Sequence, residues 1–390
     1  MVGRRRTVAS AAVERVAIVA NGFLDGPAQA LRDYLVGRGG EVITIFHPLT
    51  AEQGKRHELT TYANGSLVSR RSLTLPLRPP ASFALDPLVP LLPAKVDTWF
   101  GFNPLAGARG LVARSTGRAA RVVLWSVDFV PDRFGRGTLP TRVYDRLDRM
   151  CCRRADARVE LSEAARVARN DRHGLLGDEA PAFVVPMGAW LYRVPTTSPD
   201  NIAHRRIVFL GHLVERQGVD TLLQALTLCD DVSADVIGTG PLEADFRAET
   251  TGRGLDERVT FHGYVADHQD VEKILSAASV AVAPYRASAD SFTRYADPGK
   301  LKAYVAAGLP IVLTDVPPNA RELEAEAGAL IVADDAGAVA AGMSKMLEST
   351  DEWRARREAA LAYARRFDWE TLLGDVLAKL ERSPITKPTT

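Results

Sequence analysis

The chain has 390 residues, 46% of them hydrophobic, and a formal net charge of +1 at pH 7. Its length predicts two domains with separate cores, and its near-neutral charge provides no overall field that would draw it to nucleic acid. No apolar run approaches the roughly 18 residues of a membrane-spanning helix, and residues 1–16 lack the apolar core of a signal peptide. We therefore expect a cytoplasmic protein. Its three cysteines, two of them adjacent, predict reduced thiols and neither disulfides nor a metal site.

The first half alternates short apolar strands with amphipathic helical stretches, the pattern of a parallel sheet covered by helices on both faces. We expect a Rossmann-like domain over residues 14–195, in which the stretch 48–96 is proline-rich and irregular. Its expected strands are residues 15–20, 41–46, 121–126, 157–162 and 182–186.

Two places in this half indicate a site. Gly22 and Asp25 follow the first strand, where glycine lets a ligand approach the backbone; a tight turn with Asp25 capping the next helix explains them equally well. Asp128 lies two residues beyond a buried strand, at the edge where α/β sheets build their sites, and its carboxylate is suited to accept a proton. A turn or capping aspartate is the alternative, and Asp132 is the competing base. His47 is interpreted as a structural histidine.

A polar linker, residues 192–205, separates this half from a second one with the same alternation. We expect a second Rossmann-like domain over 204–366 and a helix over 367–390 that packs back on the first domain. The expected strands are 206–210, 234–238, 258–263, 280–285, 310–315 and 329–333, and the apolar stripe of the last helix is Trp369, Leu372, Leu373, Val376, Leu377 and Leu380. Two doubly wound domains in tandem predict a ligand cleft between them.

The stretch YADPGKLKAYVAAGLP, residues 295–310, reads as one short helix with Asp297 as its N-cap and Gly308 beyond its last turn. Lys300 then lies in the first turn, where the helix dipole disfavours a cation by about 0.3–1 kcal/mol. Backbone N–H groups and a lysine at a helix N-terminus together form a site for phosphate or diphosphate. Lys302 is interpreted as a solvated lysine.

Two other loops converge on the same edge of this domain. The turn GHLVERQG carries Gly211, His212 and Arg216, and Gly240 follows the next strand. Glycine in such turns more often serves packing than binding, so each loop alone is a weak signal. With the start of the helix at Lys300 they make three such places in one domain. The candidate ligand-binding residues of this domain are Gly211, His212, Arg216, Gly240, Tyr285, Asp297 and Lys300.

The segments GHLVERQGVDTLLQAL, VIGTGPLE, FHGYVADHQDVEKILSAASVAVAPYR and KLKAYVAAGLPIVLTD resemble the donor domain of GT-B fold glycosyltransferases in order and spacing, over nearly all of residues 206–333. The resemblance implies two Rossmann-like domains facing a central cleft, and a nucleotide-diphosphate sugar as the donor that the candidate residues of the second domain bind. It also implies that the loop with Gly22 and Asp25 lines the acceptor side of the cleft. Family-4 members hold the diphosphate with an arginine and, five positions on, a lysine; this chain has His212 and Gln217 there. They hold the sugar and ribose with two glutamates, where this chain has Tyr295 and Ala303.

The segment around Lys300 is more similar to the bacterial family-70 glucuronosyltransferase of xanthan assembly. That resemblance implies that Lys300 contacts the nucleotide diphosphate and that Asp128, in its strand and Ser-Val-Asp context, is the general base. Direct displacement by a base on the acceptor side inverts the sugar. Lys300 and helix N-termini would then stabilise the leaving group, and no metal or other cofactor is expected.

The expected function is sugar transfer to a hydroxyl of a glycan, a lipid-linked sugar or a small molecule. A retaining family-4-like transferase, a nucleotide-sugar isomerase and an inactive GT-B scaffold are the alternatives. Residues 109–172 hold fifteen arginines against eight acidic residues. This run predicts a solvated face or, alternatively, attraction to an anionic acceptor or to the inner face of a membrane, with the apolar segment 73–93 touching lipid.

Overall fold

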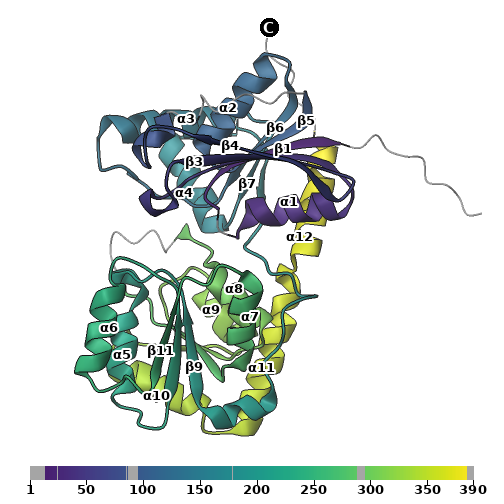
Figure 1. The fold of residues 1–390 in the computed structure, drawn as a ribbon. Helices are drawn as coiled ribbons and strands as arrows, with labels where there is room; N and C mark the ends of the chain where they lie inside the picture. The colour runs from purple at the N-terminus through teal and green to yellow at the C-terminus, as the bar shows by residue number, and fades with distance from the viewer. Residues whose placement is uncertain are drawn as a thin grey trace, which may run out of the picture.

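The computed structural model describes residues 14–23, 25–84, 86, 95–177, 179–287 and 295–383. These residues form two α/β units stacked one above the other, each built on its own sheet (Figure 1). Some expectations lie outside the described residues. They are those for residues 1–13, including the absence of a signal peptide, and those for residues 85 and 87–93 of the apolar segment 73–93.

The described part of the first unit contains an eight-stranded sheet in the order β4-β3-β2-β1-β5-β6-β7-β8. The last six strands of this order, from β2 to β8, run parallel to one another. Their bounds are β1 Arg15–Asn21, β2 Glu41–His47, β3 Arg56–Ala63, β4 Ser66–Thr74, β5 Val96–Gly101, β6 Ala119–Ser126, β7 Ala157–Glu160 and β8 Ala182–Val184. The parallel strands β1, β2 and β6 are almost wholly buried, which is why they read as continuous apolar runs.

Helices cover this sheet, and their N-termini follow local capping rules. They are α1 Pro27–Gly37, α2 Pro104–Ser115, α3 Leu139–Arg154 and α4 Glu163–His173. Thr138 caps α3 and Ser162 caps α4, each accepting a hydrogen bond from a backbone N–H of the first turn. Local sequence therefore fixes where α3 and α4 begin.

The interpretation of residues 48–96 as irregular is wrong in its first half. β3 pairs antiparallel with β2, and β4 pairs antiparallel with β3, so that a hairpin extends the parallel sheet. All nine residues of β4 are exposed. A strand shows alternating apolar and polar residues when one of its faces is buried. An edge strand that is exposed on both faces lacks this alternation, so the sequence does not reveal it.

The described part of the second unit contains a six-stranded parallel sheet in the order β11-β10-β9-β12-β13-β14. Its strands are β9 Arg206–Leu210, β10 Ser233–Ile237, β11 Val259–Gly263, β12 Val280–Ala283, β13 Ile311–Thr314 and β14 Leu330–Val332. Its helices are α5 Val219–Leu226, α6 Glu243–Gly252, α7 His268–Ala277, α8 Gly299–Ala306, α9 Ala320–Glu326, α10 Ala336–Met346 and α11 Thr350–Ala364. Both sheets thus direct their carboxyl ends and the loops that follow toward the space between the units.

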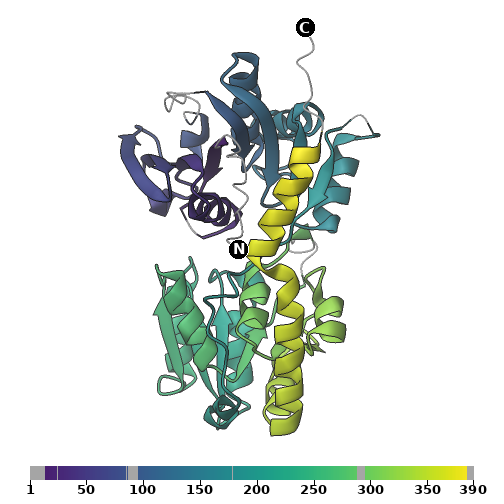
Figure 2. The ribbon, with the colours of Figure 1, turned by 90° about the vertical axis from the view of Figure 1, so that its right-hand side faces the viewer.

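Helix α12, Trp369–Arg382, crosses from the second unit to the first, as Figure 2 shows in yellow. Trp369, Leu373, Val376 and Leu380 are buried in one cluster with Ile18 of β1, and Leu372 and Leu377 pack against that cluster. The amphipathic stripe therefore fastens the end of the chain to the first unit by burying apolar surface.

None of the described helices has the length and apolar character that crossing a bilayer requires. Cys151, Cys152 and Cys229 are buried free thiols. Burial raises the pKa of Cys152 to about 12, so this thiol is protonated at neutral pH.

Candidate active site

A cavity of about 500 Å³ lies between the two units. Its walls come from the loop after β1 and the start of α1, from residues 187–194, from the loops after β9 and β11, and from the start of α8; Trp369 closes one side. The first turns of α1 and α8 both line it, and helix N-termini favour a bound anion.

Lys300 lies in the first turn of α8, as expected, and lines this cavity. Its ammonium donates a hydrogen bond of 2.6 Å to Gln217 Oε1. The same nitrogen lies 4.3 Å from the ring centre of Phe209 and 4.4 Å from that of Tyr285. Burial holds the pKa of Lys300 well below its ordinary value, and the hydrogen-bond partner of its nitrogen among the described residues is the neutral amide of Gln217.

Gly211 and Tyr285, two predicted donor residues, are next to that ammonium. A Cβ at Gly211 would lie 3.4 Å from Lys300 Nζ, and the backbone there has φ of +158°. Tyr285 is buried and gives the ammonium one of its two aromatic neighbours. Gln217 occupies the position at which the family-4 pattern has a lysine, so in this fold Lys300 brings a positive charge to that same place from a different element.

The expectations for Asp297 and Lys302 are wrong. Asp297 does not cap α8, since Pro298 holds that position without a side-chain hydrogen bond. Asp297 is buried, accepts a 2.6 Å hydrogen bond from the Met187 N–H, and lies 3.2 Å from the ammonium of Lys302, which is 2% exposed. Burial raises the pKa of Asp297, against the opposing effect of Lys302. Asp297 is therefore part of a buried ion pair and is not among the residues that line the cavity; its donor-binding role stays a prediction.

The loop after β1 forms the opposite wall. Asp25 is exposed, lines the cavity and does not cap α1, whose N-cap is Gly26 without a side-chain hydrogen bond. Gly22 is buried with φ of +111°, a left-handed conformation that glycine adopts without strain, and its N–H donates to His47 O at 2.8 Å. Gly22 therefore shapes the loop, and Asp25 is the residue that presents a polar group to the cavity.

Asp128 lies beyond β6 and is absent from the residues that line this cavity. Its carboxylate pairs with Arg133, and its carbonyl accepts from Arg169 at 2.8 Å. The next residue, Phe129, makes an edge-to-face ring contact with Tyr295 at 5.5 Å between centroids. Asp128 is thus positioned where the first unit meets the segment leading into α8, but it is engaged with an arginine.

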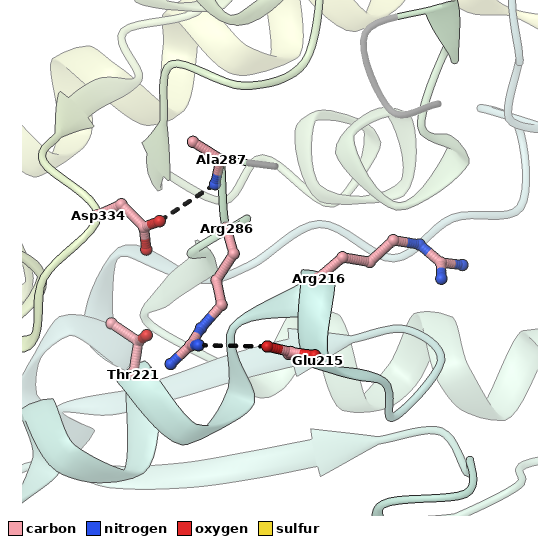
Figure 3. Close-up of a pocket in the computed structure, with 6 residues that line it drawn as sticks. All are labelled: Glu215, Arg216, Thr221, Arg286, Ala287 and Asp334. Atoms are coloured by element: carbon pink, nitrogen blue, oxygen red, sulfur yellow. Dashed lines mark hydrogen bonds and ion pairs between the residues drawn. The ribbon is translucent and has the colours of Figure 1, made fainter. Parts of the chain in front are cut away.

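Arg216 belongs to a second pocket of about 430 Å³ at the loops after β9, β12 and β14, drawn in Figure 3. Burial lowers the pKa of Arg216. Its side chain points away from Arg286, which pairs with Asp220 and lies 3.8 Å from Glu215 (Figure 3).

His212 and Gly240 are placed differently from the other predicted donor residues. His212 is exposed and does not line the cavity around Lys300. A Cβ at Gly240 would lie 2.3 Å from Leu213 O, so close packing of two loops already requires glycine here; the expected approach of a ligand stays a prediction. Two features of the cavity wall were not predicted from the sequence: the exposed aromatic side chain of Tyr264 and the ion pair between Arg193 and Glu272. Tyr264 does lie within one of the four segments that resemble a GT-B donor domain.

His47 is buried at the end of β2, as expected of a structural histidine. Burial, together with Arg109 and His57 nearby, lowers the pKa of His47 to about 3. The imidazole is therefore neutral at pH 7.

Residues 204–349 match the family model described as glycosyl transferases group 1. Sucrose-phosphate synthase from Thermosynechococcus elongatus has a similar structure, with a TM-score of 0.70 at 16% identity over 95% of this chain and 100% of that one. HepE from Anabaena in complex with UDP has a TM-score of 0.66 at 17% identity, over 94% and 99%. WaaG, a glycosyltransferase involved in lipopolysaccharide biosynthesis, has a TM-score of 0.64 at 17% identity, over 94% and 100%. The curated proteins contain no match.

The structural matches show that the chain has the GT-B fold. Residues 204–349 of the second unit are similar to group 1 glycosyl transferases. The α/β fold class and the likeness inferred from residues 206–333 are thereby confirmed.

Proposed function

We propose that this protein transfers a sugar from a nucleotide-diphosphate sugar to an acceptor hydroxyl. The observation that carries the proposal is Lys300, a half-buried cation without an acidic partner in the described residues, in the first turn of a helix that opens on the interdomain cavity. A diphosphate placed there would meet the ammonium and the N–H groups of α8 together. HepE has been solved with UDP-glucose and an Escherichia coli trehalose-6-phosphate protein with UDP-2-fluoro glucose, so UDP-sugars are the first donors to test.

For the chemical step, we propose inverting displacement with Asp128 as general base. The base must reach the acceptor hydroxyl from the first unit while the diphosphate leaves toward Lys300. Asp128 is at the carboxyl end of β6, next to the ring contact that joins the units, which supports this role. Asp25, which lines the cavity, is the competing carboxylate. No metal is required in this proposal, because Lys300 and the helix N-termini neutralise the leaving group.

The acceptor class is proposed from charge. Arg109, Arg158 and Arg169 of the arginine-rich run are buried, whereas Arg142, Arg146 and Arg149 are exposed along α3. A basic face of this kind favours an anionic acceptor, such as a lipid-linked diphosphate sugar presented at a membrane surface.

The test is a thermal-shift panel of nucleotide-diphosphate sugars, followed by transfer assays with the donors that bind. A ligand at 100 times its Kd adds about 2.7 kcal/mol of stability, so the true donor is expected to raise Tm clearly. Donor turnover that needs no acceptor would favour an isomerase. Failure of every nucleotide sugar to bind or react, with capture of a second transferase, would favour a scaffold, and a product with the donor's anomeric configuration would favour the retaining alternative.

The Lys300→Ala variant is expected to bind UDP about 1.5–3 kcal/mol more weakly, because a charge-assisted contact is lost. This corresponds to an increase in Kd of about 10- to 100-fold, measurable by calorimetry. Lys273→Ala, on an exposed lysine of α7, is the control. Equal UDP affinity in the Lys300 and Lys273 variants would exclude Lys300 from the donor site.

A further inference from the structure

Three side chains that can ligate a metal meet inside the first unit. His47 ends β2, His57 lies at the start of β3, and Asp86 follows the turn Ala81–Ala84. Their exposed fractions are 2%, 1% and 4%. His47 Nδ1 and His57 Nδ1 are 2.8 Å apart, and each lies 3.7 Å from the same oxygen, Asp86 Oδ1.

This triangle has the dimensions of a metal coordination site. A triangle with sides of 2.8, 3.7 and 3.7 Å has a circumscribed radius of about 2.0 Å, so one point lies about 2.0 Å from all three atoms. Zn²⁺ binds imidazole nitrogen at about 2.0–2.1 Å and carboxylate oxygen at about 2.0–2.2 Å. Opening the histidine pair by a few tenths of an ångström would bring the bond angles toward tetrahedral.

The polar atoms of this cluster are incompletely satisfied. Asp86 Oδ2 accepts a 2.9 Å hydrogen bond from Asn21 Nδ2, whereas Asp86 Oδ1, which faces both rings, is buried without a hydrogen-bond donor among the described residues. His57 Nε2 is likewise buried without a partner there. A buried carboxylate oxygen in this state costs free energy unless a cation compensates it.

We propose that His47, His57 and Asp86 bind one divalent transition-metal ion, with Zn²⁺ as the best fit. Two imidazoles and one carboxylate suit Zn²⁺ and its neighbours in the first transition row, whereas Ca²⁺ and Mg²⁺ prefer oxygen ligands throughout. With both Nδ1 atoms bound to the metal, each ring carries its hydrogen on Nε2. His47 Nε2, 3.5 Å from Arg109 Nη1, then cannot accept a hydrogen bond from this arginine. Arg109 Nη1 still donates to the backbone carbonyl of Asp86 at 3.3 Å.

The proposed ion acts as a brace and not as a catalyst. None of its three ligands lines the interdomain cavity, and their burial leaves them little exposed surface for a substrate. The site joins β2, β3 and residue 86, and through Asn21 it reaches the end of β1, from which the Gly22–Asp25 loop starts. The ion would therefore stiffen the base of the loop on the acceptor side, and the proposal stands whether or not the chain transfers sugar.

The experiment uses full-length protein without a histidine tag, stripped with a chelator and then titrated with Zn²⁺ or Co²⁺. Expected are one zinc per chain by elemental analysis, a higher Tm with zinc, and the intense visible absorption of tetrahedral Co²⁺. His57→Gln is expected to weaken Zn²⁺ binding by about tenfold or more, as measured by competition with a chromophoric chelator. His204→Gln, on an exposed histidine, is the matched control with wild-type affinity.

Wild-type protein that binds no stoichiometric zinc, or a His57→Gln variant with wild-type zinc affinity, would overturn the proposal. If His57→Gln does not fold, Asp86→Asn takes its place with the same expectation. The cobalt spectrum of the wild type decides independently of any variant, because the weak absorption of six-coordinate Co²⁺ would also contradict a site of this geometry.

Discussion

Changing Asp128 to Asn is expected to lower the kcat of sugar transfer by about 10²–10⁴-fold, because asparagine keeps the shape of the side chain but cannot accept the acceptor's proton. The Kd for UDP is expected to stay nearly constant, since Lys300 and Gly211 belong to the other unit. Parallel measurement of kcat and Kd separates the two effects. The product of the wild type is expected to have the inverted anomeric configuration, read by NMR.

Asp132→Asn is the matched control. Asp132 is also paired with an arginine, Arg172, at 2.7 Å, and its φ of +53° is a conformation that asparagine adopts readily. The Asp132→Asn variant is expected to have a normal kcat. Normal turnover per folded molecule in the Asp128 variant would remove Asp128 from the mechanism, and a loss in Asp25→Asn instead would assign the base to the loop after β1. If Asp128 only stabilises its turn, the same change costs at most about 2 kcal/mol of stability and leaves kcat unaffected.

Changing Lys302 to Met is expected to reduce the free energy of unfolding by about 3–5 kcal/mol, because it leaves the buried carboxylate of Asp297 without its cation. The ammonium also lies 3.7 Å from the ring centre of Phe367, a contact that the variant loses. Urea unfolding measures the loss. The double variant Lys302→Met with Asp297→Asn is expected to recover part of it, since no unpaired charge then remains buried.

Lys273→Met on the surface of α7 is the control and is expected to change stability by less than about 0.5 kcal/mol. A Lys302 variant as stable as this control would show that the pair is solvated, as the sequence alone suggested. The two lysines of α8 would then differ little, whereas the structure predicts that Lys300 governs binding and Lys302 governs folding.

The sequence by itself determined the fold class and the position of Lys300. Strands such as β1, β9 and β12 are short apolar runs because both faces of a parallel sheet are covered, and this pattern is local. Lys300 could be placed in the first turn of a helix because Pro298 and Gly308 mark its ends in the chain. Order and spacing of four segments were then sufficient to predict the similarity to group 1 glycosyl transferases over residues 204–349.

The tertiary structure decided what each polar residue contacts. Lys302 is buried because that side of α8 packs against Tyr363 and Phe367, and nothing within α8 encodes the position of that neighbour. The hairpin β3–β4 left no periodic signal in the sequence because β4 is exposed. The cluster of His47, His57 and Asp86 left none because its residues come from separate segments of the chain. Helix caps and apolar periods are properties of neighbouring residues, whereas ion pairs and ligand sites arise where distant segments meet.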